Sequence, residues 1–128
     1  MFNTHFENTL YVQIRENSFR LRHIESKKDF ELSAQRPFTT ARLLVGQYQT
    51  AELLLRKGIK EIGNGGLFRI SPVVVMHPLE MVEGGLSEVE ERLYQELALS
   101  SGARIAFVYL GLPLTDREVV SISQRKTK

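Results

Sequence analysis

The three histidines of the chain are the first candidates for metal binding or acid–base chemistry. His5, His23 and His77 lie far apart in the sequence, without the i, i+4 spacing of a helical metal site, and there is no cysteine to complete a zinc site. The pattern therefore predicts no metal centre and no cofactor. His77 precedes Pro78 at the end of an apolar run, where α/β proteins commonly bind ligands. We treat His77 as a candidate ligand residue, with a hydrogen-bonded loop histidine as the alternative.

Carboxylates and hydroxyls form no catalytic pattern. A magnesium-dependent nuclease needs clustered Asp or Glu side chains, one of them on the first strand. The first alternating segment, residues 10–15, contains no carboxylate, and Asp29 and Glu31 fall on a different segment. There is no Gly-x-Ser-x-Gly motif, and Ser87 is explained by a helix cap. We therefore expect a protein that is not an enzyme.

Basic residues are concentrated in the first part of the chain, and the candidate partner-binding residues are Arg15, Arg20, Arg22, Lys27 and Lys28. Such a cluster is typical of a surface that contacts nucleic acid or an acidic protein. No aromatic residues are interleaved for base stacking, so a solvated outer face is the alternative. A later helix carries an acidic side, which predicts attraction between copies of the chain; its members are Glu88, Glu90, Glu91 and Glu96.

Length and composition set the frame for these candidates. The chain has 128 residues, 42% of them hydrophobic, and a net charge of +2, which indicates a single globular domain over residues 1–128. No apolar run approaches the roughly 20 residues that cross a bilayer, and the first residues do not resemble a signal peptide. We therefore expect no membrane span and a cytoplasmic location.

The first half of the sequence predicts strands followed by a helix. Polar and apolar residues alternate in segments 10–15, 19–24 and 29–32, and short polar turns between them indicate an antiparallel meander. A helix with Thr50 as its cap is expected to run to Ile62 and to end at Gly63.

The second half predicts a strand, a helix and another strand. Segments 73–76 and 105–110 are apolar throughout, as in strands covered on both faces. Between them, Ser87 and Glu90 form a capping box, and one helix face is expected to hold Leu86, Val89, Leu93 and Leu97. Segment 115–123 is either a helix or a strand, and residues 124–128 are expected to be a flexible tail. We predict an α/β fold with one mixed five-stranded sheet, three antiparallel strands followed by two parallel ones, and helices packed on it.

This order resembles the ribonuclease H-like fold that the actin-like ATPases share. Several segments resemble the first lobe of the bacterial rod-shape-determining actin homologues, the MreB family. They are Arg36-Pro37, the helix 51–62, residues 72–78, and the run from Ser87 through Arg92 to Gly102-Ala103-Arg104 and Phe107. The resemblance covers most of residues 8–113, and it implies an actin-like subdomain.

The chain departs from this family where the family binds and hydrolyses ATP. Asn3 stands in place of the aspartate of the phosphate loop, and His5 stands in place of a glycine, so the loop that ends at Asn8 and Thr9 is a degenerate phosphate site. Gly111 replaces the glutamate beside the attacking water, and the family's second lobe has no counterpart.

The resemblance therefore implies a non-catalytic interaction module. Its expected partner is a cytoskeletal or cell-envelope protein or another copy of the chain. A small-ligand or nucleotide sensor, using the loops after Met76 and Leu110, is the first alternative. A nucleic-acid-binding domain is the second.

Overall fold

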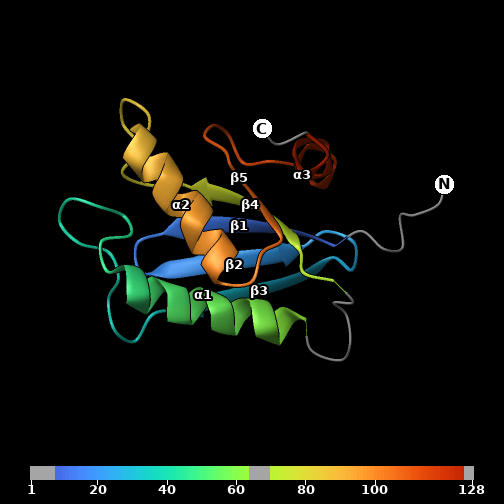
Figure 1. Ribbon diagram of the computed structural model, residues 1–128, viewed down its shortest axis with the longest axis horizontal. Coiled ribbons are helices and arrows are strands. Elements are labelled where there is room, and N and C mark those ends of the chain that lie inside the picture. Colours follow the sequence, from blue (N-terminus) through green and yellow to red (C-terminus); the bar gives the residue numbers. More distant parts are fainter. Residues whose placement is uncertain (1–7, 64–69, 126–128) are drawn as a thin grey trace.

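Five strands form one mixed sheet in the computed structural model, which describes residues 8–63 and 70–125 (Figure 1). In chain order they are β1 (Thr9–Arg15), β2 (Ser18–His23), β3 (Lys28–Ser33), β4 (Val73–Pro78) and β5 (Ile105–Val108). Their order across the sheet is β3-β2-β1-β4-β5. β1, β2 and β3 are antiparallel neighbours, whereas β4 runs parallel to both β1 and β5. The predicted α/β class and mixed sheet are therefore confirmed.

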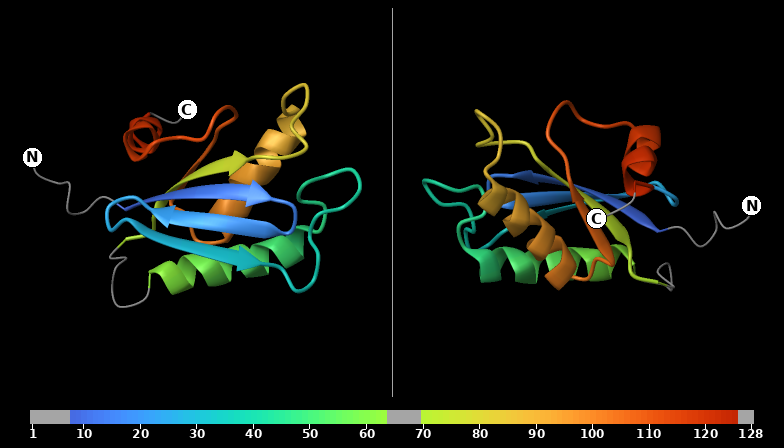
Figure 2. Two further views of the ribbon diagram at one scale, coloured as in Figure 1. Left: turned by 180° about the vertical axis from the view of Figure 1, so that it is seen from behind. Right: turned by 45° about the horizontal axis from the view of Figure 1, so that its top comes forward.

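One face of the sheet carries the main core. Successive strand residues point to opposite faces, so Leu10, Val12 and Ile14 of β1 share this face, and all three are fully buried in its core. This face is covered by α1 (Tyr48–Ile62) and α2 (Glu88–Ser100). Seen from behind, the strands β1, β2 and β3 have no helix lying across them (Figure 2, left). The main core thus lies between one face of the sheet and two helices.

The third helix, α3 (Asp116–Ser123), covers part of the opposite face. Its Val119 and Ile122 form a second, smaller core with Tyr11, Ile24 and Val75. Segment 115–123, for which the sequence allowed either a helix or a strand, therefore forms a helix. Thr115 opens it with a capping box to Glu118, and backbone hydrogen bonds continue to residues 124 and 125. The rest of the expected tail, residues 126–128, lies outside the described residues.

Helix α1 begins earlier than the sequence predicts. Its N-cap residue is Gln47, which makes no side-chain cap, so the prediction that Thr50 caps this helix was wrong. The start is set instead by the backbone N–H groups of Gly46 and Gln47, which both donate to the carbonyl oxygen of Phe38 at 2.9 Å. Gly58 lets α1 approach the sheet closely, because a Cβ atom there would lie 2.5 Å from a methyl group of Leu32.

Helix α2 has the predicted capping box between Ser87 and Glu90. Its predicted apolar face is wrong at one position, since Val89 is 77% exposed. Val89 points away from the core, because helical geometry places it about half a turn around α2 from the buried Tyr94 and Ala98. Further along the helix Tyr94 and Leu97 are buried. None of the helices in residues 8–63 and 70–125 is long and apolar enough to span a membrane.

Candidate functional site

The face of β1, β2 and β3 opposite the two long helices carries polar side chains, and we call it the open face. Strand register places Gln13 beside Arg20, and Arg20 beside Glu31. In the neighbouring row Arg22 lies between Tyr11 and Asp29. α3 contacts β1 and β4. The remaining polar residues of β2 and β3, Asp29 and Glu31 among them, therefore lie on a face that borders solvent.

A connector of residues 109–115 joins β5 to α3 and borders the open face. Pro113 of this connector lines a cavity of about 300 Å³ whose other lining residues are Gln13, Arg15, Ser18, Arg20 and Glu31. An adjoining hollow of about 260 Å³ shares Gln13 and Arg20 with it. The cavity thus brings together two of the predicted basic residues, Arg15 and Arg20.

The positive charges of these two arginines are only slightly compensated by ion pairs within the protein. Arg15 makes no ion pair with any residue in the described part of the chain, and Arg20 makes one long contact, 3.6 Å from its Nε to Asp29 Oδ1. The side chains of Arg15 and Arg20 lie diagonally across neighbouring strands on the same face, because Arg15 pairs with Ser18 and Gln13 pairs with Arg20. Two like charges at this spacing favour an anionic group between them.

Arg22 and Lys27 of the predicted basic cluster are ion-paired within the protein. Arg22 donates from Nε to Asp116 Oδ1 at 2.8 Å and from Nη2 to Oδ2 at 3.0 Å, and its Nη1 donates to Asp29 Oδ2 at 2.6 Å. Lys27 Nζ lies 3.2 Å from Asp116 Oδ2. The hydrogen bond from Arg22, and then that from Lys27, lowers the pKa of Asp116 to about 2, and Asp116 in turn raises the pKa of Arg22. This network attaches the start of α3 to β2.

Lys28 lies apart from the other four basic residues. It pairs with His23 at the far end of β2, whereas Arg15 pairs with Ser18 at the near end. Lys28 is exposed and does not line the cavity of the open face. The predicted cluster therefore separates into Arg15 and Arg20, which make at most one long ion-pair contact, the ion-paired Arg22 and Lys27, and Lys28 at the far end of β2.

His77 holds the connector against the sheet. Its Nε2 lies 2.9 Å from the carbonyl oxygen of Gly111, which can only accept, so Nε2 carries the proton. Its Nδ1 then accepts from the Tyr11 hydroxyl at 2.7 Å, and that hydroxyl accepts from the backbone N–H of Leu114 at 3.0 Å. The His77 side chain is 1% exposed, and burial lowers its pKa and raises that of Tyr11. The geometry matches the alternative that the sequence left open, a hydrogen-bonded histidine that positions a loop.

The predicted phosphate loop lies partly outside the described residues, because Asn3 and His5 precede residue 8. Asn8 and Thr9 are buried at the start of β1. The side-chain amide of Asn8 donates to the carbonyl oxygen of Ile70 at 2.7 Å, and its Oδ1 lies 2.7 Å from Nε2 of His23. The backbone N–H of Thr9 donates to Glu25 at 2.9 Å. Both polar atoms of the Asn8 side chain are thus engaged within the protein.

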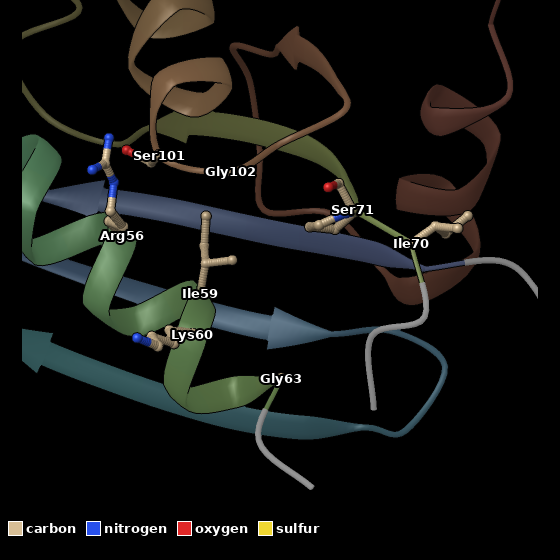
Figure 3. A pocket seen from close by; sticks show the side chains of 9 residues that line it. Arg56, Ile59, Lys60, Gly63, Ile70, Ser71, Ser101 and Gly102 are labelled. Atoms are coloured by element: carbon tan, nitrogen blue, oxygen red, sulfur yellow. The ribbon is translucent and has the colours of Figure 1, made fainter. Parts of the chain in front are cut away.

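A second cavity, of about 390 Å³, lies between the ends of α1 and α2 (Figure 3). Arg56 and Lys60 line it, and Arg56 donates to the carbonyl oxygen of Ser100 at 2.6 Å. Both helices end here, and helix C-termini carry partial negative charge. The two cations therefore stabilise helix ends. Because the C-terminal ends of both helices border this cavity, it offers less to an anion than the open face does.

Metal ligands are not assembled anywhere in the described residues: no group of three or more His, Cys, Asp or Glu side chains that could hold an ion occurs in 8–63 and 70–125.

Comparison with known proteins identifies a relative. No family model matches the chain. It is 36% identical over 95 residues to the Escherichia coli (strain K12) protein described as "Uncharacterized protein YjaA", an alignment that covers 70% of this chain and 73% of YjaA. The chain belongs to the YjaA family. The description of YjaA assigns no activity. The relationship therefore identifies the family but no function, and a function has to be inferred from the geometry of the site.

Three residues that organise the site in this YjaA-family domain were not predicted as site residues: Tyr11, Gln13 and Asp116. Tyr11 and Gln13 alternate with the core residues of β1, and this alternation was the available signal, since it places them with Arg15 on the outer face. Asp116 gave no local signal, because its partner Arg22 lies 94 residues earlier.

Proposed function

We propose that this YjaA-family protein is a non-catalytic interaction domain that binds a protein partner through its open face. The proposal includes a ribonuclease H-like fold similar to the first lobe of a bacterial actin homologue. The strand order and directions, with one helix after each of β3, β4 and β5, agree with those that the resemblance implies and support it. That resemblance favours a cytoskeletal or cell-envelope protein, or a second copy, as the partner.

The observation that carries the proposal is an exposed apolar side chain in the connector, next to a proline that borders Arg15 and Arg20, two arginines with little ion pairing inside the protein. Leu112, in the connector, is 82% exposed, and it precedes Pro113, which shares a cavity with Arg15 and Arg20. Protein interfaces are enriched in arginine and have apolar centres, so this combination suits a protein partner.

The connector is also held in place before any partner binds. Tyr11 bonds to the backbone of Leu114, and His77 bonds to that of Gly111, so both ends of the turn that carries Leu112 are fixed to the sheet. A surface that is already ordered loses less conformational entropy on binding. This rigidity favours a recognition surface over a loop without a role.

The chemistry of the open face supports binding without catalysis. His77 is buried and bonded through both ring nitrogens, and burial raises the pKa of the Tyr11 hydroxyl. Neither group is poised to exchange protons with a bound molecule near neutral pH.

A small-ligand sensor is the second candidate, because the cavity beneath Pro113 combines both signs of charge. Arg15 and Arg20 suit a carboxylate, and Glu31 suits an ammonium group. A thermal-shift screen with amino acids and nucleotides separates the candidates. A saturable rise in the unfolding temperature that requires Arg15 and Glu31 favours the sensor.

The interaction domain is tested by placing the photo-crosslinking residue benzoylphenylalanine at position 112 in cells of the native host. The matched control is the same residue at position 89, where the natural Val89 is also exposed but lies on α2. We expect discrete crosslinked products at 112 alone. They should disappear when Arg15 and Arg20 are changed to glutamate, and persist with Arg92→Glu on α2.

Equal crosslinking at the two positions, or products at 112 that survive the charge reversal of Arg15 and Arg20, would refute the proposal. A product with twice the mass of the chain identifies a second copy as the partner.

A further inference from the structure

A groove runs between β3 and α1, on a different side of the molecule from the connector. Its cavity measures about 410 Å³. The strand side contributes Leu32 and Ala34, and α1 contributes Leu53, Leu54 and Lys57. Leu53 is 67% exposed, so it stabilises little within the domain itself. The groove thus combines apolar side chains that the fold leaves partly uncovered with polar ones, among them Ser33, Gln35 and Thr50.

The edge of the sheet beside this groove has free hydrogen-bonding groups. β3 is the last strand of the described sheet on this side. The backbone N–H of Ala34 donates to Asn17, and in an antiparallel ladder every second residue then bonds to the neighbouring strand. Asp29, Glu31 and Ser33 therefore direct their backbone groups outward. A free edge of this kind is a template for an additional strand.

One end of the groove is positively charged. Arg36 lies there, together with the start of α1, where Thr50 also lines the cavity. The N-cap residue Gln47 makes no side-chain cap, and the first turn of α1 contains no acidic residue. The first backbone N–H groups of a helix carry partial positive charge. A carboxylate at this end would meet both Arg36 and the helix start.

A second copy of β3 does not fit this edge well. Antiparallel pairing of β3 with itself through its outward residues places Glu31 opposite Glu31, or Asp29 opposite Glu31, in the registers that overlap most. Like charges in such positions destabilise the pairing. A different chain is therefore the better occupant.

We propose that the groove binds an extended peptide, which adds to the sheet as an antiparallel or parallel strand beside β3. Its side chains alternate, with apolar residues against Leu53 and Leu54 and a carboxylate near Arg36. A basic residue on the other side of the added strand meets Glu31, which makes no ion pair within the described residues. Main-chain hydrogen bonds supply affinity, and the alternate side chains supply specificity.

The test is to select binders from a library of random peptides of about ten residues with free carboxyl termini. The enriched sequences should alternate apolar residues, and their binding should weaken when the carboxyl terminus is amidated or an acidic side chain is removed. The decisive variant is Glu31→Pro, since proline removes an outward N–H that the fold does not use and is tolerated at a sheet edge. Glu31→Ala is its matched control, because it removes the same side chain and keeps that N–H.

We expect Glu31→Pro to lower the affinity for the selected peptide by about tenfold or more, whereas Glu31→Ala should change this affinity by no more than about twofold. Leu53→Glu should weaken it similarly, and Val89→Glu, the matched change at another exposed helix position, should not. Bound peptide should slow hydrogen exchange of the backbone N–H groups of Glu31 and Ser33. Unchanged unfolding temperatures verify that the variants fold.

A library without binders, or binders that Glu31→Pro leaves unaffected, overturns the proposal. So does exchange protection confined to the connector and the open face. None of these results bears on the photo-crosslinking at position 112, so the two proposals fail separately.

Discussion

Replacing Tyr11 by phenylalanine removes a single oxygen atom from beneath the connector. That oxygen donates to His77 Nδ1 at 2.7 Å and accepts from the N–H of Leu114 at 3.0 Å. The amide of Gln13 lies further away, at 3.4 Å, and contributes little. The change therefore leaves one buried acceptor and one partly buried donor without partners.

The expected cost follows from these two groups. A buried polar group without a partner costs about 1–3 kcal/mol, and the partly buried N–H of Leu114 belongs at the lower end. We expect Tyr11→Phe to lower the free energy of unfolding by about 2–4 kcal/mol. Hydrogen exchange at Leu114 should also accelerate, because the connector loses one of its attachments.

Urea unfolding measures the first effect, and hydrogen exchange followed by NMR measures the second. Tyr109→Phe is the matched control, because its hydroxyl donates to Leu112 in an exposed position and should contribute at most about 1 kcal/mol. The double variant with His77→Leu should cost less than the sum of the two single changes. A loss below about 0.5 kcal/mol for Tyr11→Phe, or additive effects, would show that the network does not hold the connector.

Three further changes test the rest of the structure. Asp116→Asn should lower the free energy of unfolding by about 1 kcal/mol at pH 7, a value reduced for solvent screening. Because the pKa of Asp116 is lowered to about 2, this ion pair stabilises the fold above the carboxyl's ordinary pKa; the difference from the unmodified protein should shrink as the pH of urea titrations falls from about 4 to 2. Ser87→Ala should cost about 1 kcal/mol by removing the cap of α2, measured by thermal unfolding. Gly58→Val should cost about 1–3 kcal/mol by displacing Leu32, and an unchanged unfolding temperature would contradict the close approach of α1 to β3.

Elements that depend on local pattern were predictable from the sequence. Alternation located β1, β2 and β3 to within one or two residues, and the capping box located the start of α2 at Ser87. The start of α1 was not predictable in this way, since it depends on backbone bonds to Phe38, a residue outside the helix. The exposure of Val89 was missed because the predicted apolar face was drawn through the leucines, whereas the buried face of α2 is centred on Tyr94, Leu97 and Ala98.

The candidate site was predictable only in part. Alternation placed Arg20 and Arg22 on one strand face, as the structure has them. Alternation could not show that Arg22 is held by an ion pair whereas Arg20 is largely accessible, because the partner of Arg22, Asp116, lies 94 residues later in the sequence. The position of His77 was predicted at a strand end, whereas its attachment to Tyr11 arises from two strands that pair 66 residues apart.

The position of α3 has a consequence for local unfolding. The main core needs nothing beyond β5, so α3 can detach from the sheet while that core stays folded. Tyr11, Ile24 and Val75 then lose the cover of Val119 and Ile122. Molecules in this partly opened state would present an apolar strip and would aggregate more readily than the fully folded protein.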